Sequence, residues 1–525
     1  MKRFCFIILI FLTFSYQSCT DLDAELYSQI TPNKFYQNDA QLVSAASAAY
    51  TPLYGYWALH ELTDLTTDQS TCPIRSNGGW NDGGLWPRLI SHDFRPNENV
   101  ASRWNQWFGG VSACNRLIEV FTEQLGTDAP IISELRALRA FYFYILLDLF
   151  GNIPIETRFA EAEEAPEQVT PAEAFAFIEQ EILESIDQLS EDKTTTYAKM
   201  NRWVAYTLLA KLYLNAERFG AGAHWSEAAE AANQVINSGA YDLELLYFSN
   251  FTLSNEGSNE NIFVVPYDKT NALGFSVRHQ ALHQSADVTF NFTESPWGGF
   301  SVQEDFYKSF DEDDKRRGMF IVGQQYTQQA QPSFSEEFGF YYANPKDEFK
   351  LIDCVEDFDN LTEAEKQEEP EDCNIFITPE ITLSEARGIA KYEEGARYAK
   401  YEYDQNTAFD LPNDFAIFRY ADVLLMRAEA LWRMDNGSIE ALTLVNQVRD
   451  RAGIDPLTTL TEDDLYWETK KELALENHAR NTTIRFGHYE DPWFLKTDAD
   501  PIKRWFPIPQ EQLQANTNLK QNPGY

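Results

Sequence analysis

The chain has 525 residues, and its 42 basic and 82 acidic side chains leave a formal net charge of −40. This charge excludes a protein that grips nucleic acid, because neutralising phosphates requires a basic surface. The hydrophobic share of 44% is enough to bury a large core, which excludes an intrinsically disordered protein. Phe, Tyr and Trp make up 14% of the residues, an excess that a core alone does not require.

The amino-terminal segment is typical of a bacterial export signal. Lys2 and Arg3 precede the apolar run 4–14, which is too short to span a membrane. Cys19 stands where cleavage makes it the first mature residue, so 1–18 is predicted to be a lipoprotein signal peptide and Cys19 its lipidation site. Acyl chains hold a protein on a membrane without any basic patch. The alternative is an ordinary secreted protein with an incidental cysteine.

Helical patterns dominate the first half of the chain. Residues 131–150 carry apolar side chains at alternating steps of four and three, the spacing of an amphipathic helix. The next helix begins at 170–173 (TPAE), a capping box with proline at the first helical position. Further helices are predicted at 199–217 and 225–238. Their small alanine faces favour tetratricopeptide-like stacking, although no strict repeat is visible.

The second half begins with a different pattern. Across 246–411 the helical periodicity fades, Gly, Pro, Asn and Gln become frequent, and short β-like runs such as 262–265 appear. We expect one domain, 19–525, with a mostly α-helical scaffold interrupted by an irregular insert of loops and short strands that carries the ligand site. The predicted boundaries are 31–245 and 412–480 for the scaffold, 246–411 for the insert and 491–525 for a Pro-rich tail, with late helices at 415–434, 438–452 and 462–478.

Several long segments resemble those of one known family. They are 138–142 (LRAFY), 150–154 (FGNIP), 419–430 (RYADVLLMRAEA), 445–453 (VNQVRDRAG) and 518–525 (NLKQNPGY). In sequence and in order they resemble the motifs of the SusD/RagB-like outer-membrane lipoproteins, the starch-binding SusD-like nutrient-uptake proteins of Bacteroidetes. The resemblance extends from Cys19 to Tyr525.

The resemblance implies a mostly α-helical fold with four tetratricopeptide-like helix pairs. It implies a lipid-anchored protein of the outer-membrane surface that captures oligosaccharide or polysaccharide and delivers it to a SusC-like TonB-dependent transporter, without hydrolysis and without a cofactor. One alternative is a peptide-binding member of the same fold that feeds such a transporter. Another is a glycoside hydrolase, because among 82 carboxylates a pair at catalytic separation cannot be excluded by counting.

A glycan presents hydroxyl groups and flat C–H faces, so its site needs exposed aromatic rings beside polar side chains. Residues 75–86 contain two tryptophans and four glycines, which let the backbone turn tightly and expose the indoles. The alternative is that such tryptophans fill a gap in the core and that nearby carboxylates cap helices. The ligand-binding residues predicted in this part of the chain are Trp80, Trp86, Asn81, Asp82, Asp64 and Asp68.

A second aromatic segment, 295–300 (SPWGGF), lies in the insert. Trp297 and Phe300 are its predicted ligand contacts, and Arg387 and Tyr392 are further candidates. Three other tryptophans fall at helical spacing and are predicted to be core: Trp57, Trp104 and Trp203.

Two charged patterns suggest metal chemistry and are interpreted otherwise. His279 and His283 have the spacing of a zinc-binding HExxH motif, but Gln280 takes the place of the general-base glutamate, which excludes a working zinc protease. The acidic run 311–314 precedes the basic run 315–317, which predicts local ion pairing rather than a cation site.

The acidic stretch 353–373 leaves two hypotheses open. Asp357 and Asp359 are part of a run dense enough in oxygen ligands for structural calcium, although the glycine and spacing of an EF-hand are missing. The alternative is a solvated loop. Cys354 and Cys373 bracket the stretch and are predicted to form a disulfide, which an exported protein permits.

Overall fold

The structure is a computed structural model, and the residues that it describes are 39–76, 78–159, 165–327, 332–342, 375–383, 389–404, 409–497 and 500–525. It divides into two units, Met1–Ala48 and Ala49–Tyr525. The first contains most of helix α3 (Asp39–Tyr50), and the second contains the other elements. No helix in the described ranges is long and apolar enough to cross a membrane. The predicted signal peptide and Cys19 lie outside these ranges.

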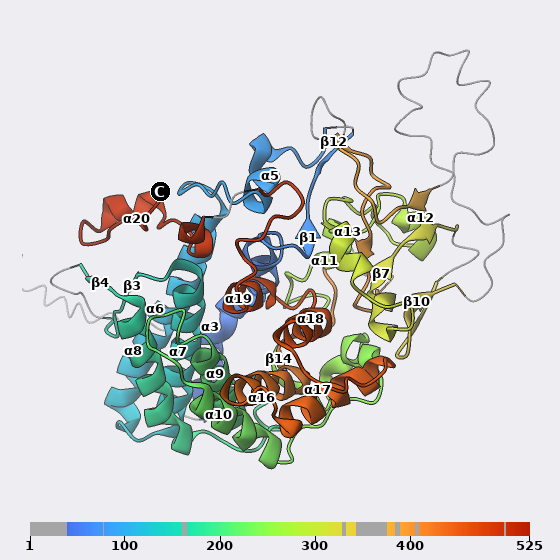
Figure 1. The fold of residues 1–525 in the computed structure, drawn as a ribbon. Helices are drawn as coiled ribbons and strands as arrows, with labels where there is room; N and C mark the ends of the chain where they lie inside the picture. The colour runs from blue at the N-terminus through green and yellow to red at the C-terminus, as the bar shows by residue number, and fades with distance from the viewer. Residues whose placement is uncertain are drawn as a thin grey trace, which may run out of the picture. The chain divides into compact units, whose positions relative to one another are not determined.

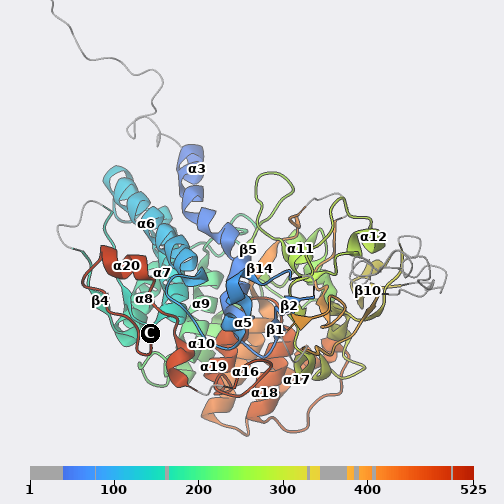
Figure 2. The same cartoon turned by 90° about the horizontal axis from the view of Figure 1, so that it is seen from above.

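The unit Ala49–Tyr525 is built mainly from helices that pack on one another in chain order. Each long helix contacts the next, and α10 contacts α16 directly although the whole insert separates them in the sequence. Figures 1 and 2 show this row on one side and the loop-rich insert on the other. The predicted mostly α-helical, tetratricopeptide-like fold is confirmed. The long helices are α6 (Asn99–Leu125), α7 (Pro130–Phe150), α8 (Pro171–Ser185), α9 (Arg202–Leu214), α10 (Trp225–Asn237), α16 (Tyr420–Met434), α17 (Ile439–Ala452) and α18 (Glu462–Glu472).

Helix α7 lies between α6 and α8 in this row. Its sequence predicts one apolar stripe, yet every residue from 137 to 150 is buried, because α6 and α8 both pack against it. The following helix begins as predicted. The Thr170 hydroxyl accepts a hydrogen bond from the Glu173 amide, and the Thr170 amide donates to the Glu173 carboxylate at 2.8 Å, which completes the capping box.

One predicted helix start is wrong. Residues 415–419 form strand β14 (Phe415–Arg419), which pairs antiparallel with β5 (Asn261–Val265), and α16 begins only at Tyr420. All five residues of β14 are buried, so the strand lacks the alternation that marks a half-buried strand. A short run buried on both faces cannot be told from a buried helix by periodicity. The β-like run predicted at 262–265 is confirmed as part of β5.

The helix predicted for 462–478 is also too long. Helix α18 ends at Glu472, and α19 (Ala479–Arg485) begins after a turn in which Leu475 and Asn477 have φ values of 62° and 66°. These left-handed conformations interrupt a helix. The Asn477 amide donates to the Tyr56 carbonyl at 2.8 Å and accepts from the Thr63 hydroxyl at 3.1 Å, so long-range polar contacts favour the turn.

Short paired strands hold the early chain against the insert. Strand β1 (Ser70–Thr71) pairs antiparallel with β6 (Ser301–Val302), and β2 (Ile74–Arg75) pairs parallel with β12 (Ile389–Ala390). These pairings place residues 75–86 beside the insert. The other strands are β3 (Ile153–Pro154) with β4 (Gln168–Val169), β7 (Phe320–Ile321) with β13 (Arg397–Tyr398), β8 (Gly323–Gln324) with β11 (Phe376–Ile377), and β9 (Ser333–Ser335) with β10 (Gly339–Tyr341).

Short helices connect these strands and end the chain. Helix α4 precedes β1, α5 follows the glycine-rich loop, and α11 to α13 lie within the insert (Figure 1). The Pro-rich tail contains a short 3₁₀ helix, Pro501–Arg504, and the helix α20. The bounds are α4 (His60–Thr63), α5 (Leu85–Ile90), α11 (Val277–Ala281), α12 (Ala286–Phe290), α13 (Glu304–Lys308) and α20 (Gln510–Ala515).

A buried network of opposite charges joins the insert to the late helices. Arg419 contacts Glu260 at 2.9 Å and Glu472 at 3.1 Å, and Arg451 contacts the same Glu472 at 2.5 Å. Arg316, in the basic run that follows the acidic run, pairs with Asp314 at 2.9 Å, so the two runs form an ion pair as predicted. We call this set the junction network; its members are Asp314, Arg316, Glu260, Lys400, Arg419, Arg451, Glu468, Glu472 and Glu476.

Candidate functional site

The fold brings the two aromatic segments singled out from the sequence into contact. Between ring centroids, Trp80 lies 5.2 Å from Phe300 and 6.4 Å from Trp297. Trp86 lies 5.5 Å from Trp80, and Phe409 lies 6.0 Å from Trp297. These separations are those of packed aromatic pairs. We call these five residues the aromatic platform.

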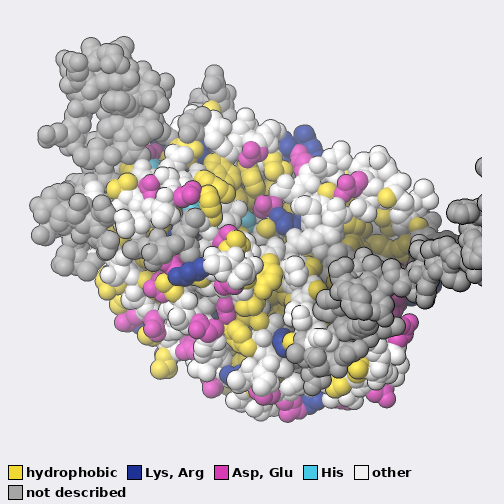
Figure 3. Space-filling view, turned by 180° about the vertical axis from the view of Figure 1, so that it is seen from behind, with side chains coloured by type: hydrophobic (Ala, Val, Ile, Leu, Met, Phe, Trp, Pro, Cys, Tyr) yellow, Lys and Arg dark blue, Asp and Glu magenta, His cyan; other side chains and the backbone are white. Residues whose placement is uncertain are grey.

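The platform has an exposed part and a buried floor. The side chains of Trp297 and Phe409 are 44% and 40% exposed, and Trp80 is half-buried. Trp86 and Phe300 are buried beneath them. Figure 3 shows that hydrophobic side chains gather across the upper and central part of one face of the molecule, with acidic side chains more frequent toward its lower edge. Large aromatic rings held in the surface are costly to leave in water, so they indicate a binding region.

Backbone geometry explains how Trp80 is held. Its φ of 59° is a left-handed conformation that costs a bulky residue roughly 1–3 kcal/mol. The Trp80 indole N–H donates to the Trp297 carbonyl at 2.9 Å. The ring also lies directly over Gly299, where an added Cβ would come within 2.1 Å of it. The strained backbone and the missing side chain at Gly299 together place the indole against the second segment.

Two polar residues accompany the tryptophans. Asp82 accepts a hydrogen bond from the Trp86 indole N–H at 2.6 Å, so it orients a floor residue. Asn81, immediately before it, is exposed. The amide of Asn81 therefore supplies both a donor and an acceptor at the edge of the platform.

Asp64 and Asp68 lie elsewhere, and their positions argue against the predicted ligand contact. Asp64 is 1% exposed at the end of α4, and burial raises the pKa of its carboxyl to about 7. Asp68 is ion-paired with Lys470 of α18, whose ammonium group is fully buried. Asp64 is buried and Asp68 is held in an ion pair, so we leave both out of the site. The polarity of a residue in the sequence does not show whether its side chain is exposed.

Tyr392 and the platform residue Phe300 are both buried beneath the exposed rings. Tyr392 is 3% exposed, and a Cβ on Gly298 would lie 2.9 Å from its ring. Neither ring is available for stacking in this structure. Arg387, the fourth candidate from the insert, lies outside the described residues. The same is true of Asp357 and Asp359, and of Cys354 and Cys373, so the calcium and disulfide hypotheses stay predictions.

The histidine pair of the insert is structural. His279 is fully buried beside Trp297 and Phe409, at centroid distances of 5.5 Å and 4.5 Å. Burial lowers the pKa of His279 to about 4, so the ring is neutral at neutral pH. His283 lies 3.7 Å from Glu393. Within the described residues, no group of three His, Cys, Asp or Glu side chains is arranged to hold a metal ion.

Two features of the site were not predicted from the sequence. Phe409 follows the polar stretch 404–407 with no glycine or second aromatic beside it, so no local pattern distinguishes it from other phenylalanines. Two arginines, Arg75 and Arg397, contact the backbone of 298–301, and no local sequence pattern distinguishes them from other arginines. The predicted core tryptophans Trp57 and Trp104 are buried, whereas Trp203 is only partly buried.

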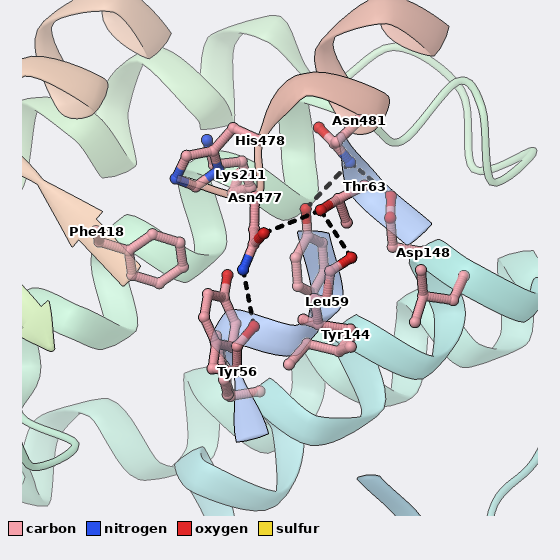
Figure 4. Close-up of a pocket in the computed structure, with 13 residues that line it drawn as sticks. Tyr56, Leu59, Thr63, Tyr144, Asp148, Lys211, Phe418, Asn477, His478 and Asn481 are labelled. Carbon is pink, nitrogen blue, oxygen red and sulfur yellow. Dashed lines mark hydrogen bonds between the residues drawn. The ribbon is translucent and has the colours of Figure 1, made fainter. Parts of the chain in front are cut away.

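A small pocket in the scaffold is a weaker candidate for the glycan site than the platform. Figure 4 shows polar side chains around it, including Lys211 of α9, Asp148 of α7 and Asn477 of the turn between α18 and α19. Its volume is about 40 Å³, which suffices for roughly two or three water molecules and not for a sugar ring.

Two open grooves are larger. One of about 410 Å³ lies between α6 and the tail and includes Trp104, and one of about 380 Å³ includes Trp505. Each groove contains a single tryptophan, whereas the platform brings three of them together. Among the described residues, the platform therefore best matches the aromatic surface that a glycan requires.

Comparison with known proteins places the chain in a family. The model of the SusD family matches residues 259–497, and the model described as "Starch-binding associating with outer membrane" matches 58–214. The chain is a SusD/RagB-like protein. Starch-binding protein SusD of Bacteroides thetaiotaomicron is 24% identical over 438 residues, covering 76% of this SusD-like chain and 74% of the relative. SusD-like protein P2 of Formosa agariphila is 24% identical over the full length of both chains.

Solved structures share the fold of this SusD-like chain. A SusD superfamily protein from Parabacteroides distasonis has a TM-score of 0.71 at 20% identity, covering 95% of this chain and all of that one. Surface glycan-binding protein A from Bacteroides thetaiotaomicron in complex with laminarihexaose has a TM-score of 0.69 at 21% identity, covering 92% of this chain and 99% of that one. At these identities the likeness establishes the fold alone.

Proposed function

We propose that this SusD-like chain captures an oligosaccharide or polysaccharide at the cell surface, without hydrolysing it, and delivers it to a SusC-like TonB-dependent transporter. The observation that carries the proposal is the aromatic platform, in which Trp297 and Phe409 are exposed over a floor of further rings. Proteins of related sequence or fold include a starch-binding protein and one solved with laminarihexaose, and these ligands support a glycan here.

The platform suits a sugar for a physical reason. The flat C–H face of a pyranose is apolar and its edge carries hydroxyls, so it binds to an aromatic ring with polar groups around it. Trp297 and Phe409 offer two adjacent rings tilted by 44°, and Trp80 continues the surface at 51° to Trp297. Asn81 stands at the edge as a partner for hydroxyls. More than one sugar residue therefore finds a ring.

The rest of the proposal concerns attachment and delivery. A lipid on Cys19 anchors the protein in the outer membrane, which its strongly acidic surface could not do by charge. Tethering beside a transporter raises the effective concentration of captured glycan, so affinities in the micromolar to millimolar range, about −8 to −4 kcal/mol, suffice.

The test of glycan binding is affinity electrophoresis of the mature protein in gels containing laminarin, starch and other polysaccharides. We expect retardation by at least one glycan, and its loss in Trp297→Ala and Trp80→Ala with an unchanged circular dichroism spectrum. The matched control is Trp505→Ala, which removes the tryptophan of a groove. If both platform variants are still retarded and Trp505→Ala is not, the glycan binds in the groove that contains Trp505 and not at the platform.

The same material distinguishes the alternatives. Binding of oligopeptides with no retardation by any glycan would replace the glycan with a peptide. Release of reducing ends from a retained polysaccharide would show hydrolysis.

Delivery and anchoring have their own test. We expect Cys19→Ala to shift the protein from the outer-membrane fraction to the soluble fraction, and the wild type to co-purify with a TonB-dependent transporter from solubilised outer membranes. An unchanged distribution of the variant would contradict the anchor.

A further inference from the structure

Two fully buried arginines meet beneath the loop that carries Trp297. Arg75 comes from strand β2 and Arg397 from strand β13, and the side chains are 0% exposed. Both donate to the Ser301 hydroxyl, Arg75 at 2.6 Å and Arg397 at 2.7 Å. One small side chain thus joins two guanidinium groups from distant parts of the sequence. We call Arg75 and Arg397 the arginine clamp.

The clamp contacts consecutive carbonyl groups of the loop. Arg397 donates to the carbonyls of Gly298 at 3.2 Å and Phe300 at 3.3 Å, and Arg75 donates to the carbonyl of Gly299, between them, at 2.9 Å. The loop belongs to no sheet at these positions, so the arginines supply the donors that neighbouring strands supply elsewhere.

The amide groups of the same loop are bound on the opposite side. The Trp297 amide donates to the His279 carbonyl at 2.6 Å, and the amides of Gly299 and Phe300 both donate to the Gln280 carbonyl at 2.9 Å. Helix α11 thus holds the loop by its N–H groups and the clamp holds it by its C=O groups. The amides of Trp297, Gly299 and Phe300 and the carbonyls of 298–300 each have a specific partner.

The clamp also contacts the segment after β12. Arg75 donates to the carbonyls of Lys391 at 2.8 Å and Glu394 at 2.9 Å, and Arg397 donates to the carbonyl of Tyr392. Tyr392 is the ring over which Gly298 packs. A rigid planar fork with five donors serves several acceptors at fixed angles, which a lysine ammonium does not.

The electrostatics of the clamp are unfavourable for simple stabilisation. Burial and the adjacent charge of Arg75 hold the pKa of Arg397 well below its ordinary value. Burying two guanidinium groups side by side carries a desolvation cost that must be offset by their hydrogen bonds. Such a cost is typical of sites where geometry matters more than stability.

We propose that Arg75 and Arg397 are positioning residues that give loop 298–301 the shape in which Trp297 and Trp80 form a continuous stacking surface. This inference rests on the proposed function for its purpose, but the shape of the platform is measurable without ligand. Neither arginine reaches the surface, so neither touches the glycan itself.

The experiment compares Arg75→Lys and Arg397→Lys with a matched scaffold variant, Arg485→Lys. The side chain of Arg485 is also buried, but it pairs with the carboxylate of Glu429 at 2.8 Å, away from the platform. The first measurement is the exciton couplet of the packed indoles in the circular dichroism spectrum, defined as the difference between wild type and Trp80→Phe. The second is the dissociation constant for laminarihexaose and for soluble starch, measured at a temperature well below the melting temperature of each variant.

We expect the clamp variants to lose the couplet and to bind at least about tenfold more weakly, because a loosened loop misaligns the stacking rings. We expect Arg485→Lys to lower the melting temperature while keeping the couplet and the affinity. Folded clamp variants with the wild-type couplet would overturn the proposal, as would an equal loss in Arg485→Lys.

A third variant covers the case in which the lysine variants do not fold. Ser301→Ala removes only the hydroxyl that both arginines share. It is expected to weaken the couplet, and an unchanged couplet would overturn the proposal. If wild type binds no glycan while these variants still change the couplet, the proposed function fails and the clamp stands as the determinant of the platform's shape.

Discussion

Two groups of buried arginines in this protein have opposite surroundings. In the junction network, Arg316, Arg419 and Arg451 each contact carboxylates. In the arginine clamp, Arg75 and Arg397 donate to backbone carbonyls and to one serine. The first group neutralises charge and joins distant elements. The second brings two guanidinium groups together and binds the carbonyls of a single loop.

This difference suggests that the junction network contributes mainly to stability and the arginine clamp mainly to the shape of the site. Glu472 accepts contacts from arginines of the insert, of β14 and of α17, so one carboxylate ties three parts of the chain together. Removing it should unfold the protein before it changes the site. The clamp lies beneath the platform, where a small displacement changes the alignment of rings without unfolding the scaffold. The predictions below test this separation, from the largest expected effect to the smallest.

Glu472→Gln should have the largest effect. It removes a buried charge that faces three arginines, and breaking such a network from one side costs about 3–5 kcal/mol of unfolding free energy. Arginine contacts also hold the pKa of Glu472 well below its ordinary value, so this contribution is present above pH 4 or so and is lost as the pH falls further. Denaturant unfolding at pH 7 measures the loss.

The control for that change is Glu440→Gln, which removes the exposed partner of Arg427. Its expected effect is at most about 1 kcal/mol. Equal effects of the two variants would contradict the central role of the junction network, and a change of glycan affinity in folded Glu472→Gln would contradict the separation of stability from site.

Asp64→Asn should change the pH dependence of stability and leave binding alone. The carboxyl has a pKa of about 7 in the folded protein and about 4 in the unfolded chain, so its favourable contribution is complete below pH 4 and lost as the pH rises through 7. From pH 5 to pH 8 the variant should gain about 2–3 kcal/mol relative to wild type. Thermal or denaturant unfolding at the two pH values tests this, and a constant difference would show that Asp64 ionises normally.

Gly299→Ala should damage the platform more than the scaffold. A Cβ at this position would come within 2.1 Å of the Trp80 ring, so the indole must move. The expected loss of glycan affinity is about tenfold, equivalent to about 1.4 kcal/mol. The melting temperature should fall less than in Glu472→Gln. Gly109→Ala is the control, because a Cβ there meets open space; equal loss of affinity in both variants would show that Trp80 is not what matters.

Thr170→Ala should have the smallest effect. It removes the hydroxyl that caps α8, which costs about 1 kcal/mol of unfolding free energy. The affinity for any glycan should stay the same, because α8 lies in the helical row away from the platform. A measurable change in affinity would mean that scaffold stability and site geometry are coupled.

Sequence analysis predicted the scaffold better than the site, and particular residues show why. The capping box at Thr170 and the helix 131–150 depend on near neighbours in the chain, and both formed as expected. Strand β14 was misread because its five residues are all buried, which removes the alternating pattern. The left-handed turn at Leu475 and Asn477 depends on partners that lie about 400 residues away in the sequence, such as Tyr56.

For the site, composition singled out Trp80 and Trp297 because glycines surround them, and the fold brought them together. It also singled out Asp64, which is buried, because polarity alone does not reveal burial. Phe409 and the arginine clamp gave no local signal. The clamp binds carbonyl groups, which every residue possesses, so only the folded backbone identifies its target.

The central claim is that the aromatic platform binds glycan. The most direct test measures binding to a carbohydrate array by the mature protein and by its Trp80→Ala/Trp297→Ala double variant. The two proteins must have similar melting temperatures, so that both are folded during the measurement. We predict that wild type binds at least one glycan and that the double variant binds none of those it recognised. A double variant that binds as wild type does, or a wild type that binds oligopeptides and no glycan, would contradict the claim.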